Sequence, residues 1–462
     1  MYYNTVMEKI KEPSIAGTFY PDDAISLINL IESFKQDSRN YYDYATRAVI
    51  VPHAGLVFSG RLSYEGINQL DKNIENIFII APAHRISFEG IALTSYDKWK
   101  TPLGDIEVNQ DINKELEAEF GALYRDDTIS PEHSLEIEVP VIQSVFDGVK
   151  IVPILIGSRV RPHDISKIIS KYYSDNKNGF VISSDLSHFL NENKAKELDQ
   201  TTAQMIETGN IRNFQYEMAC GAIGITGLVE FANQNQFTMI RIDMANSGDV
   251  NGDKSRVVGY GAWFLYEGDK NEFIKIYHSD FVIGLCKTVI KSVFDKKPLT
   301  ILYPQVFDEL GACFVTLEQN GQLRGCIGSL IAHRPLVNDL AENAKNAAFN
   351  DTRFRPVNAD DANHLKVNVS LLSNPRQITF SGEEDLLEKI TPYLDGIIIR
   401  DGNRQSTFLP SVWEQIPDKQ EFLKALKQKA GFSADYFSPT FEAYRYETIY
   451  IKEDDLESEA EI

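Results

Sequence analysis

The chain has 462 residues, and 46 Lys and Arg against 67 Asp and Glu give it a formal net charge of −21. Its 43% of hydrophobic residues supply enough apolar material for packed cores, so the composition excludes intrinsic disorder, and the length indicates two domains. The acidic balance disfavours nucleic acid and anionic membranes as partners, and no apolar run reaches the roughly 18–20 residues that span a bilayer.

Cysteine usage and the first residues bear on the compartment. The segment MYYNTVMEKIKEPSIAG has no basic stretch followed by an apolar one, so we expect no standard secretory signal. The four cysteines form no CxxC pair and no disulfide framework. We therefore expect reduced thiols in a cytoplasmic protein.

The first 266 residues alternate short β-branched runs with longer amphipathic stretches. Several runs are continuously apolar, which is typical of strands covered on both faces. The pattern predicts an α/β domain over residues 12–266, with a mostly parallel or mixed central sheet covered by helices. The predicted strands are Ala48–Val51, Asn76–Ile80, Lys150–Ile156, Gly179–Ser183, Thr238–Ile242 and Val257–Leu265, and the predicted helices include Asp23–Phe34, Gln110–Phe120, His163–Ser174 and Asn193–Glu207.

A polar, glycine-containing stretch at 267–273 predicts a linker to a second domain. The pattern of residues 274–452 predicts a smaller α+β domain. The ten residues at 453–462 carry six carboxylates and predict a frayed, solvated acidic tail. The predicted helices of the second domain are Phe281–Phe294, Leu336–Phe349 and Lys419–Ala430, and the predicted strands are Ala312–Leu317, Gly325–Ile327, Lys366–Leu372 and Gly396–Arg400.

The placement of the eight histidines is the most informative chemical feature. His53, His84 and His188 each follow a strand-like run, in AVIVPHAG, IFIIAPAH and FVISSDLSH. If these strands run parallel, the three imidazoles meet at the carboxyl ends of the strands, where α/β sheets bind ligands. His133, in SPEHSLEIEVP, precedes a predicted helix and is flanked by Glu132. His163, His278, His333 and His364 lack such a context and are expected at the surface or at helix starts.

These histidines predict a shared metal or catalytic site, against the alternative of separate polar residues at strand ends. Two histidines and one carboxylate form the facial arrangement of non-haem Fe(II) enzymes. The candidate carboxylate is Asp249 in MANSGDVNGD, where neighbouring glycines permit close approach. Asp185 is expected either to orient His188 or to cap the turn after its strand, and Cys220 to pack in or line a pocket.

A second candidate site lies in the LRGCIGSL segment of the C-terminal domain. Arg324 and Cys326 share one face if this segment is a strand, and a guanidinium near a thiol lowers its pKa. Arg353 and Arg355 follow in FNDTRFRPV and are candidate contacts for an anionic ligand. The alternative is structural, with glycines for tight packing and arginines in ion pairs. Phosphate-binding loops and nucleophile elbows are absent from the sequence.

Two sets of ordered motifs resemble known families. AGTFYP at 16–21, VPHAG at 51–55, APAH at 81–84, EHSLEIEVP at 132–140, SSDLSH at 183–188 and the ANSGDVNGD block resemble the Memo family. LRGCIGSL at 323–330, FNDTRFRPV at 349–357, VNVSLLSNP at 367–375 and TFLPSVW at 407–413 look like an AMMECR-type domain. In prokaryotes these two proteins are commonly grouped with a radical-SAM enzyme, in the AmmeMemoRadiSam set.

The Memo resemblance implies a fold similar to class III extradiol dioxygenases, which are non-haem iron enzymes. It implies that His53 and His84 bind a metal and that His188 is an acid/base residue. Val250 and Ile223 stand where animal Memo proteins have a metal-site cysteine and a pocket histidine. These departures favour Asp249 as a harder third ligand, and they argue against carrying over the phosphotyrosine-peptide binding attributed to animal Memo.

We therefore expect a metal-dependent, dioxygenase-like oxidoreductase acting on a small molecule. One divalent transition metal, with Fe(II) ahead of Zn and Cu, would be held by His53, His84 and Asp249. His188 and His133 would act as acid/base groups, and Asp185, Glu132 and Cys220 would surround them. We expect this enzyme to act with a radical-SAM partner. The alternative is a non-catalytic binding or scaffold protein whose pocket recognises a peptide, a small molecule or a partner enzyme.

Overall fold

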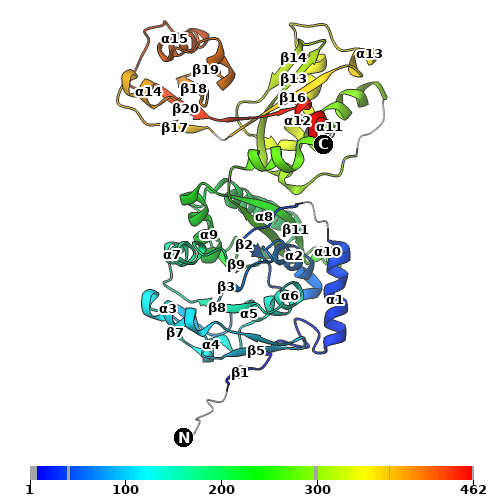
Figure 1. Cartoon of the computed structure of the whole chain (residues 1–462), viewed down its shortest axis with the longest axis vertical. Coiled ribbons are helices and arrows are strands. Elements are labelled where there is room, and N and C mark those ends of the chain that lie inside the picture. Colours follow the sequence, from blue (N-terminus) through cyan, green and yellow to red (C-terminus); the bar gives the residue numbers. More distant parts are fainter. Residues whose placement is uncertain (1–7, 39–41, 296–299, 374, 460–462) are drawn as a thin grey trace. The chain divides into compact units, whose positions relative to one another are not determined.

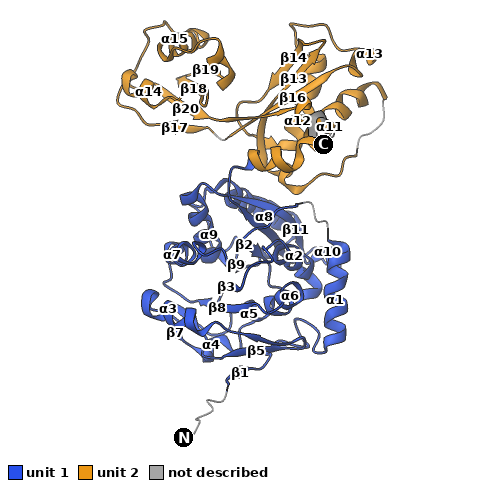
Figure 2. Ribbon diagram, in the orientation of Figure 1, with its two compact units in different colours: residues 1–270 blue, residues 271–462 orange. Residues whose placement is uncertain are grey.

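The computed structural model describes residues 8–38, 42–295, 300–373 and 375–459, which form two units that divide between Lys270 and Asn271 (Figure 2). Among these residues no helix has the length and apolar character needed to cross a membrane.

The first unit is built on a mixed sheet, nine-stranded within the described residues, in the order β10-β12-β2-β9-β3-β8-β4-β7 with β11 paired to β12 (Figure 1). Its centre is parallel, because β2, β9, β3 and β8 all run the same way. On either side β12 and β4 run antiparallel to this centre. The predicted mixed sheet covered by helices is confirmed.

A small sheet of β1, β5 and β6 lies beside the main one in the first unit. The elements in chain order are β1 (Ile10–Lys11), α1 (Ala24–Asp37), β2 (Ala48–Val51), α2 (Leu56–Asn68), β3 (Asn76–Pro82), β4 (Ile91–Leu93), β5 (Lys98–Thr101), β6 (Gly104–Glu107), α3 (Gln110–Phe120), β7 (Leu123–Tyr124), α4 (Asp126–Ile129), α5 (His133–Glu136), α6 (Glu138–Val145), β8 (Lys150–Ile156), α7 (Pro162–Tyr173), β9 (Asn178–Ser183), β10 (His188–Leu190), α8 (Glu192–Thr208), α9 (Ala222–Asn235), β11 (Thr238–Asn246), α10 (Gly248–Asn251) and β12 (Val257–Tyr266).

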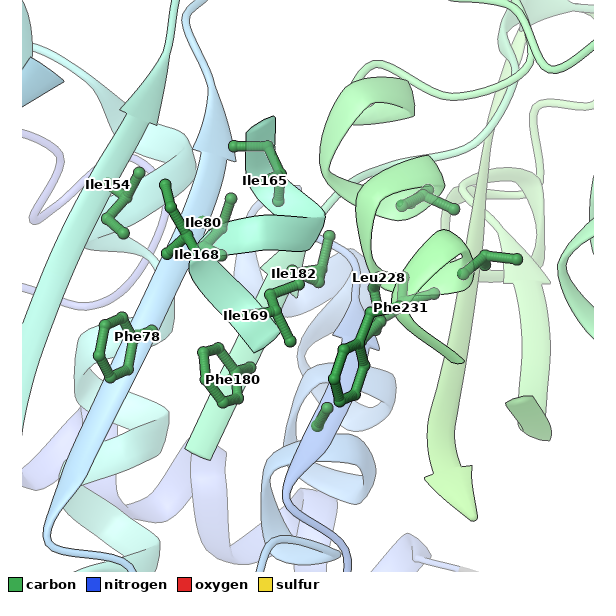
Figure 3. Close-up of a cluster of buried hydrophobic side chains, with 14 of the residues drawn as sticks. Phe78, Ile80, Ile154, Ile165, Ile168, Ile169, Phe180, Ile182, Leu228 and Phe231 are labelled. Atoms are coloured by element: carbon green, nitrogen blue, oxygen red, sulfur yellow. The ribbon is translucent and has the colours of Figure 1, made fainter. Parts of the chain in front are cut away.

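The central strands are apolar on both faces because helices cover both. On one face α7 and α9 pack against the sheet, and the side chains between the layers are buried (Figure 3). Helix α2 also covers part of the sheet, where it contacts β2, β11 and β12. The cluster between α7, α9 and the sheet includes Phe78, Ile80, Ile154, Phe180 and Ile182 from the strands and Ile165, Ile168, Ile169, Leu228 and Phe231 from the helices.

Helix α9 packs closely against its neighbours because glycines lie at the contacts. A Cβ at Gly221, just before α9, would lie 2.6 Å from Ser184 Cβ, just after β9, and one at Gly227 would lie 2.7 Å from Ile165 Cβ on α7. The small residues of CGAIGITG therefore permit a helix that intrinsic propensity disfavours. For the same reason the sequence pattern missed α9, as it missed the glycine-containing α2.

The second unit is an α+β structure with antiparallel sheets, as predicted. One sheet has the order β14-β13-β16-β21 with β15 on β13, and the other has the order β17-β20-β18-β19. Trp413 and Phe422 stack at the centre of one core, with ring centroids 3.5 Å apart. The elements are α11 (Lys270–Asp295), η1 (Gln305–Asp308), β13 (Leu310–Gln319), β14 (Gln322–Gly328), β15 (Arg334–Pro335), α12 (Leu336–Phe349), α13 (Ala359–Ala362), β16 (Lys366–Leu372), β17 (Arg376–Ile378), α14 (Glu383–Lys389), β18 (Gly396–Asp401), β19 (Arg404–Phe408), η2 (Pro410–Glu414), α15 (Lys419–Lys429), β20 (Glu442–Tyr446), β21 (Thr448–Lys452) and α16 (Glu453–Glu459).

Three expectations about the second half differ from the structure. Residues 270–273 of the predicted linker belong to α11, because Phe273 is buried and extends the helix. His278 is buried rather than exposed, at a kink of α11, and contacts the ring of Phe307. The acidic segment begins as helix α16, where Glu453 accepts a hydrogen bond from Val367 N–H at 2.8 Å and pairs with Lys287. Residues 460–462 of the predicted tail lie outside the described residues.

Candidate metal centre

His53 follows β2 and is 1% exposed. Its backbone N–H donates to Asp185 Oδ1 at 2.8 Å, and its Nδ1 lies 2.9 Å from Ser183 Oγ at the end of β9. Burial, together with positive charge on His84 and His133, lowers the pKa of His53 well below its ordinary value. The ring is therefore neutral, which is the form that binds metals.

Glu132 lies between His84, at the end of β3, and His133, at the start of α5. His84 N–H donates to Glu132 Oε2 at 2.6 Å, and His133 N–H donates to Oε1 at 3.0 Å. The same Oε1 lies 3.4 Å from His84 Nδ1 and 3.0 Å from His133 Nδ1. Burial raises the pKa of Glu132, but hydrogen bonds from His133 and His84 outweigh it and lower the pKa overall. Glu132 is thus an ionised carboxylate behind two histidines, an arrangement that orients metal ligands.

The rings of His53, His84 and His133 meet at one point. Their centroids are 4.8–5.5 Å apart, and each ring offers a nitrogen within 4.8 Å of the nitrogens of the other two. Among the described residues, His133 Nδ1 is buried and makes no hydrogen bond of normal geometry. Nitrogens bound at about 2.1 Å to one ion lie at most about 4.2 Å apart, so small ring movements close the group. Three imidazoles with a carboxylate behind two of them fit a divalent transition metal.

The group of three histidines differs from the predicted ligand set in one member. His133, which was predicted as an acid/base residue, joins His53 and His84, whereas Asp249 is not part of this group in the described residues. Asp249 is exposed in α10, and its Oδ2 accepts the backbone N–H of Asn246 at 2.8 Å. Its carboxylate therefore caps its own loop, a role that short acidic side chains commonly take in turns.

His188 lies beside the group without belonging to it. It begins β10, and burial lowers its pKa, opposed by a hydrogen bond to the Leu186 backbone. A charge on His84 also lowers the pKa of His188, so the two rings are electrostatically coupled. Asp185 does not take the role of orienting His188: its carboxylate accepts the N–H groups of His53 and Ala54. Burial raises the pKa of Asp185 to about 7, and these two N–H groups oppose the shift.

Cys220 and Glu138 complete the surroundings of His53. Cys220 Sγ lies 3.3 Å from His53 Nε2, and burial raises the pKa of its thiol to about 12. Ser183 Oγ, which contacts His53 Nδ1, also donates to Glu138 Oε1 at 2.9 Å. Burial raises the pKa of Glu138 to about 8. The sequence analysis missed Glu138; the only signal was a third carboxylate in EHSLEIEVP, two residues after Glu136.

A cavity of about 650 Å³ adjoins the histidines. His84 and Cys220 are part of its wall, and the rest comes from the carboxyl ends of β3 and β8, the start of α9 and the segment before it. Ile223, at the position of the pocket histidine of animal Memo proteins, also lines it. A cavity of this size accommodates a small organic molecule.

Ion pairs connect the residues of the second candidate site. Arg353 forms two hydrogen bonds to Asp351, at 3.0 and 2.7 Å, and also donates to the Cys326 carbonyl at 3.1 Å. Asp351 in turn accepts Cys326 N–H at 2.9 Å, and the Arg353 guanidinium lowers the pKa of Asp351. Arg324 lies 3.7 Å from Asp361, while Arg355 is exposed.

The glycine between Arg324 and Cys326 has a packing role. A Cβ at Gly325 would lie 2.1 Å from the carbonyl oxygen of Ala347 in α12, so the strand and the helix are in direct backbone contact there. Together with the ion pairs, this close contact supports the structural interpretation of the LRGCIG motif.

The comparisons with known proteins agree with both units. The family described as Memo-like protein matches residues 11–264, and AMMECR1 matches residues 283–451. A MEMO1 family protein of Thermoplasma acidophilum, Ta0237, is 30% identical over 263 residues, which cover 54% of this chain and 97% of that protein. One of Methanobrevibacter smithii is 31% identical over 286 residues, covering 55% of this chain and 98% of its own.

Among solved structures, the uncharacterized protein PH0010 from Pyrococcus horikoshii is similar at 29% identity and a TM-score of 0.34, over 37% of this chain and 88% of its own. The Memo match covers more than half of the 462 residues, and the AMMECR1 match covers most of the second unit. The chain therefore belongs to the Memo family, and it carries an AMMECR1 domain fused to its Memo domain.

Proposed function

We propose that the Memo domain is a metal-dependent oxidoreductase that holds one divalent transition metal through His53, His84 and His133. The observation that carries the proposal is the meeting of three imidazoles beside a cavity, with the ionised Glu132 behind two of them. Imidazole suits iron, zinc and copper, and Fe(II) is our first choice because of the resemblance to extradiol dioxygenases. When bound, such an ion supplies Lewis acidity and, in the case of Fe(II), redox chemistry with dioxygen.

The residues around the group have separate tasks in this proposal. Glu132 orients the His84 and His133 rings through its Oε1, which lies 3.4 and 3.0 Å from their Nδ1 atoms, and Asp185 holds the loop of His53 through its backbone. His188 is neutral near pH 7 because burial lowers its pKa, so it is able to accept a proton from a substrate hydroxyl. The cavity beside His84 and Cys220 receives the small-molecule substrate.

Metal content tests the proposal. Wild-type protein prepared without an affinity tag is expected to bind one equivalent of Fe(II) under anaerobic conditions, and His53→Ala, His84→Ala and His133→Ala are expected to lose it. Asp249→Ala and the exposed His163→Ala serve as controls that keep the metal. Full occupancy in the first three variants would remove the proposed site. Oxygen uptake with a panel of catechols then tests the reaction class.

A second candidate is a non-catalytic binding protein, and the observation that favours it is the fusion itself. Joining two modules raises their effective concentration and suits work on a common partner. In this case a radical-SAM protein is recovered by the full chain in a pull-down, and no catechol or other phenol is turned over. Oxygen uptake that depends on His84 would favour the enzyme instead.

A further inference from the structure

The charge in the cavity of the Memo domain is opposite to the charge of the chain. The chain carries −21, yet the residues that line the cavity include Arg85 and Arg212 and neither Asp nor Glu. Arg85 follows His84 at the end of β3, whereas Arg212 lies 127 positions later, between α8 and α9. The fold therefore brings two distant cations to one cavity.

These two arginines also differ from the others in their partners. Nine arginines of the first unit are described, and six of them form ion pairs with carboxylates. Arg256 packs over the ring of Phe189 instead. For Arg85 and Arg212 the described residues provide no ion pair. Of the three arginines in the described part of the first unit that have no carboxylate partner, two line the same cavity.

The remaining wall is suited to an apolar body. Phe88, Phe214 and Ile223 line the cavity together with further aliphatic side chains. Apolar walls with a few polar groups that fix orientation are typical of small-molecule sites. Guanidinium groups bind carboxylates and phosphates through paired hydrogen bonds, and the exposed Arg85 and Arg212 are open to such a ligand.

We infer that the cavity binds a small molecule with an aromatic or other apolar body and one oxyanion, a carboxylate or a phosphate, which Arg85 and Arg212 recognise. The inference deepens the proposed function, because the same cavity includes His84 and Cys220 and so presents the ligand to the metal group. The oxyanion lies with the arginines, and the apolar body of the ligand fills the cavity that His84 and Cys220 also line. Binding of the oxyanion itself requires no metal.

Ligand-observed NMR titration of the metal-free full chain tests this inference with three probes. Benzoate and phenyl phosphate carry the two oxyanions, and benzamide is the neutral match. We expect at least one anion to bind on the order of tenfold more tightly than benzamide, since a hydrogen bond to a charged group is worth about 1.5–3 kcal/mol. The tighter of the two anions identifies the oxyanion.

Arg85→Gln and Arg212→Gln are each expected to weaken anion binding on the order of tenfold without changing benzamide binding. Arg159→Gln is the matched control: it makes the same charge change at an exposed residue that pairs with Glu89 outside the cavity, and it is expected to have no effect. Equal binding of anions and benzamide, no detectable anion binding, or wild-type affinity in the Arg85→Gln, Arg212→Gln double variant would each overturn the inference.

The variant His53→Ala separates the two proposals. If it loses metal but still binds the anion, both stand. If wild-type protein takes up no metal but the arginine-dependent binding is present, the proposed function fails and the oxyanion site remains. If metal binds normally and the arginine variants bind the anion as wild type does, only the oxyanion site fails.

Discussion

Glu132 and Glu136 lie four residues apart and are predicted to have different roles. Loss of the Glu132 charge is expected to weaken metal binding, and loss of the Glu136 charge is expected to lower the stability of the fold. Glu132 faces the histidines, where it accepts the backbone N–H groups of His84 and His133. Glu136 instead pairs with Lys11 at 2.5 Å, and both side chains are 2% exposed. The substitutions Glu132→Gln and Glu136→Gln remove the same charge from neighbouring turns.

Glu132→Gln is expected to weaken metal binding about 10–100-fold, which corresponds to about 1.4–2.7 kcal/mol, because outer partners of metal-binding histidines contribute this much. The NH2 group of glutamine would also face the backbone N–H groups of His84 and His133, which donate to the carboxylate in the wild-type protein. Glu136→Gln leaves the Lys11 ammonium buried without its counter-ion and is expected to lower the free energy of unfolding by about 3–5 kcal/mol. Tyr20 OH donates to Oε1 and Ser14 Oγ donates to Oε2, so the single oxygen of glutamine keeps only one of these two hydrogen bonds.

The assays are competition with a chelator for Fe(II) under anaerobic conditions and urea unfolding of the metal-free protein. Metal affinity is measured only under conditions in which each variant is folded, as judged by near-UV circular dichroism. Wild-type affinity in Glu132→Gln would refute the role of Glu132 in orienting the histidines. An equal loss of affinity in Glu136→Gln would show that the two carboxylates do not have separate roles.

Other predictions concern glycine packing and pH. Gly325→Ala is expected to destabilise the second unit by several kcal/mol, because its Cβ would meet the Ala347 carbonyl oxygen at 2.1 Å. Gly284→Ala, in open space within α11, is expected to stabilise it by about 0.5–1 kcal/mol. Urea unfolding followed by fluorescence checks both variants, and equal effects would contradict the packing argument. Burial raises the pKa of Asp199 to about 6, opposed by the Ser187 N–H that it accepts at 2.9 Å. The unfolded chain ionises this group from about pH 4, so the folded state loses up to about 3 kcal/mol between roughly pH 4 and 6. Asp199→Asn is therefore expected to stabilise the protein at pH 7 and not at pH 4, and a gain that is the same at both values would show that ionisation is not its cause.

The strands and the convergence of two histidines could be predicted from the sequence. The apolar runs before His53 and His84 have strand bounds close to those of β2 and β3, and parallel strands end at one edge of a sheet. The likeness to the Memo and AMMECR1 families was also visible in ordered motifs and is confirmed. Helix α9 was not predicted, because its glycines become favourable only against Ser184 and Ile165.

The choice of the third histidine depended on tertiary structure. The sequence favoured Asp249 because a carboxylate in a glycine-containing loop after a strand suits a ligand, but its oxygen accepts the backbone of its own loop. His133 lies in a short helix whose position depends on Glu132 bonding across to the end of β3. Such a contact joins residues 48 positions apart and leaves no periodic signal in the chain.

The sequence by itself determined the secondary-structure pattern, the two-domain organisation and the residue types available for chemistry, because these depend on local periodicity and composition. Only the tertiary structure decided which polar groups lie together. It brings His133 next to His53 and His84, and it places Arg85 and Arg212 in the wall of one cavity. The physical reason is that long-range packing positions side chains to within an ångström, whereas sequence spacing alone restricts them only to one edge of a sheet.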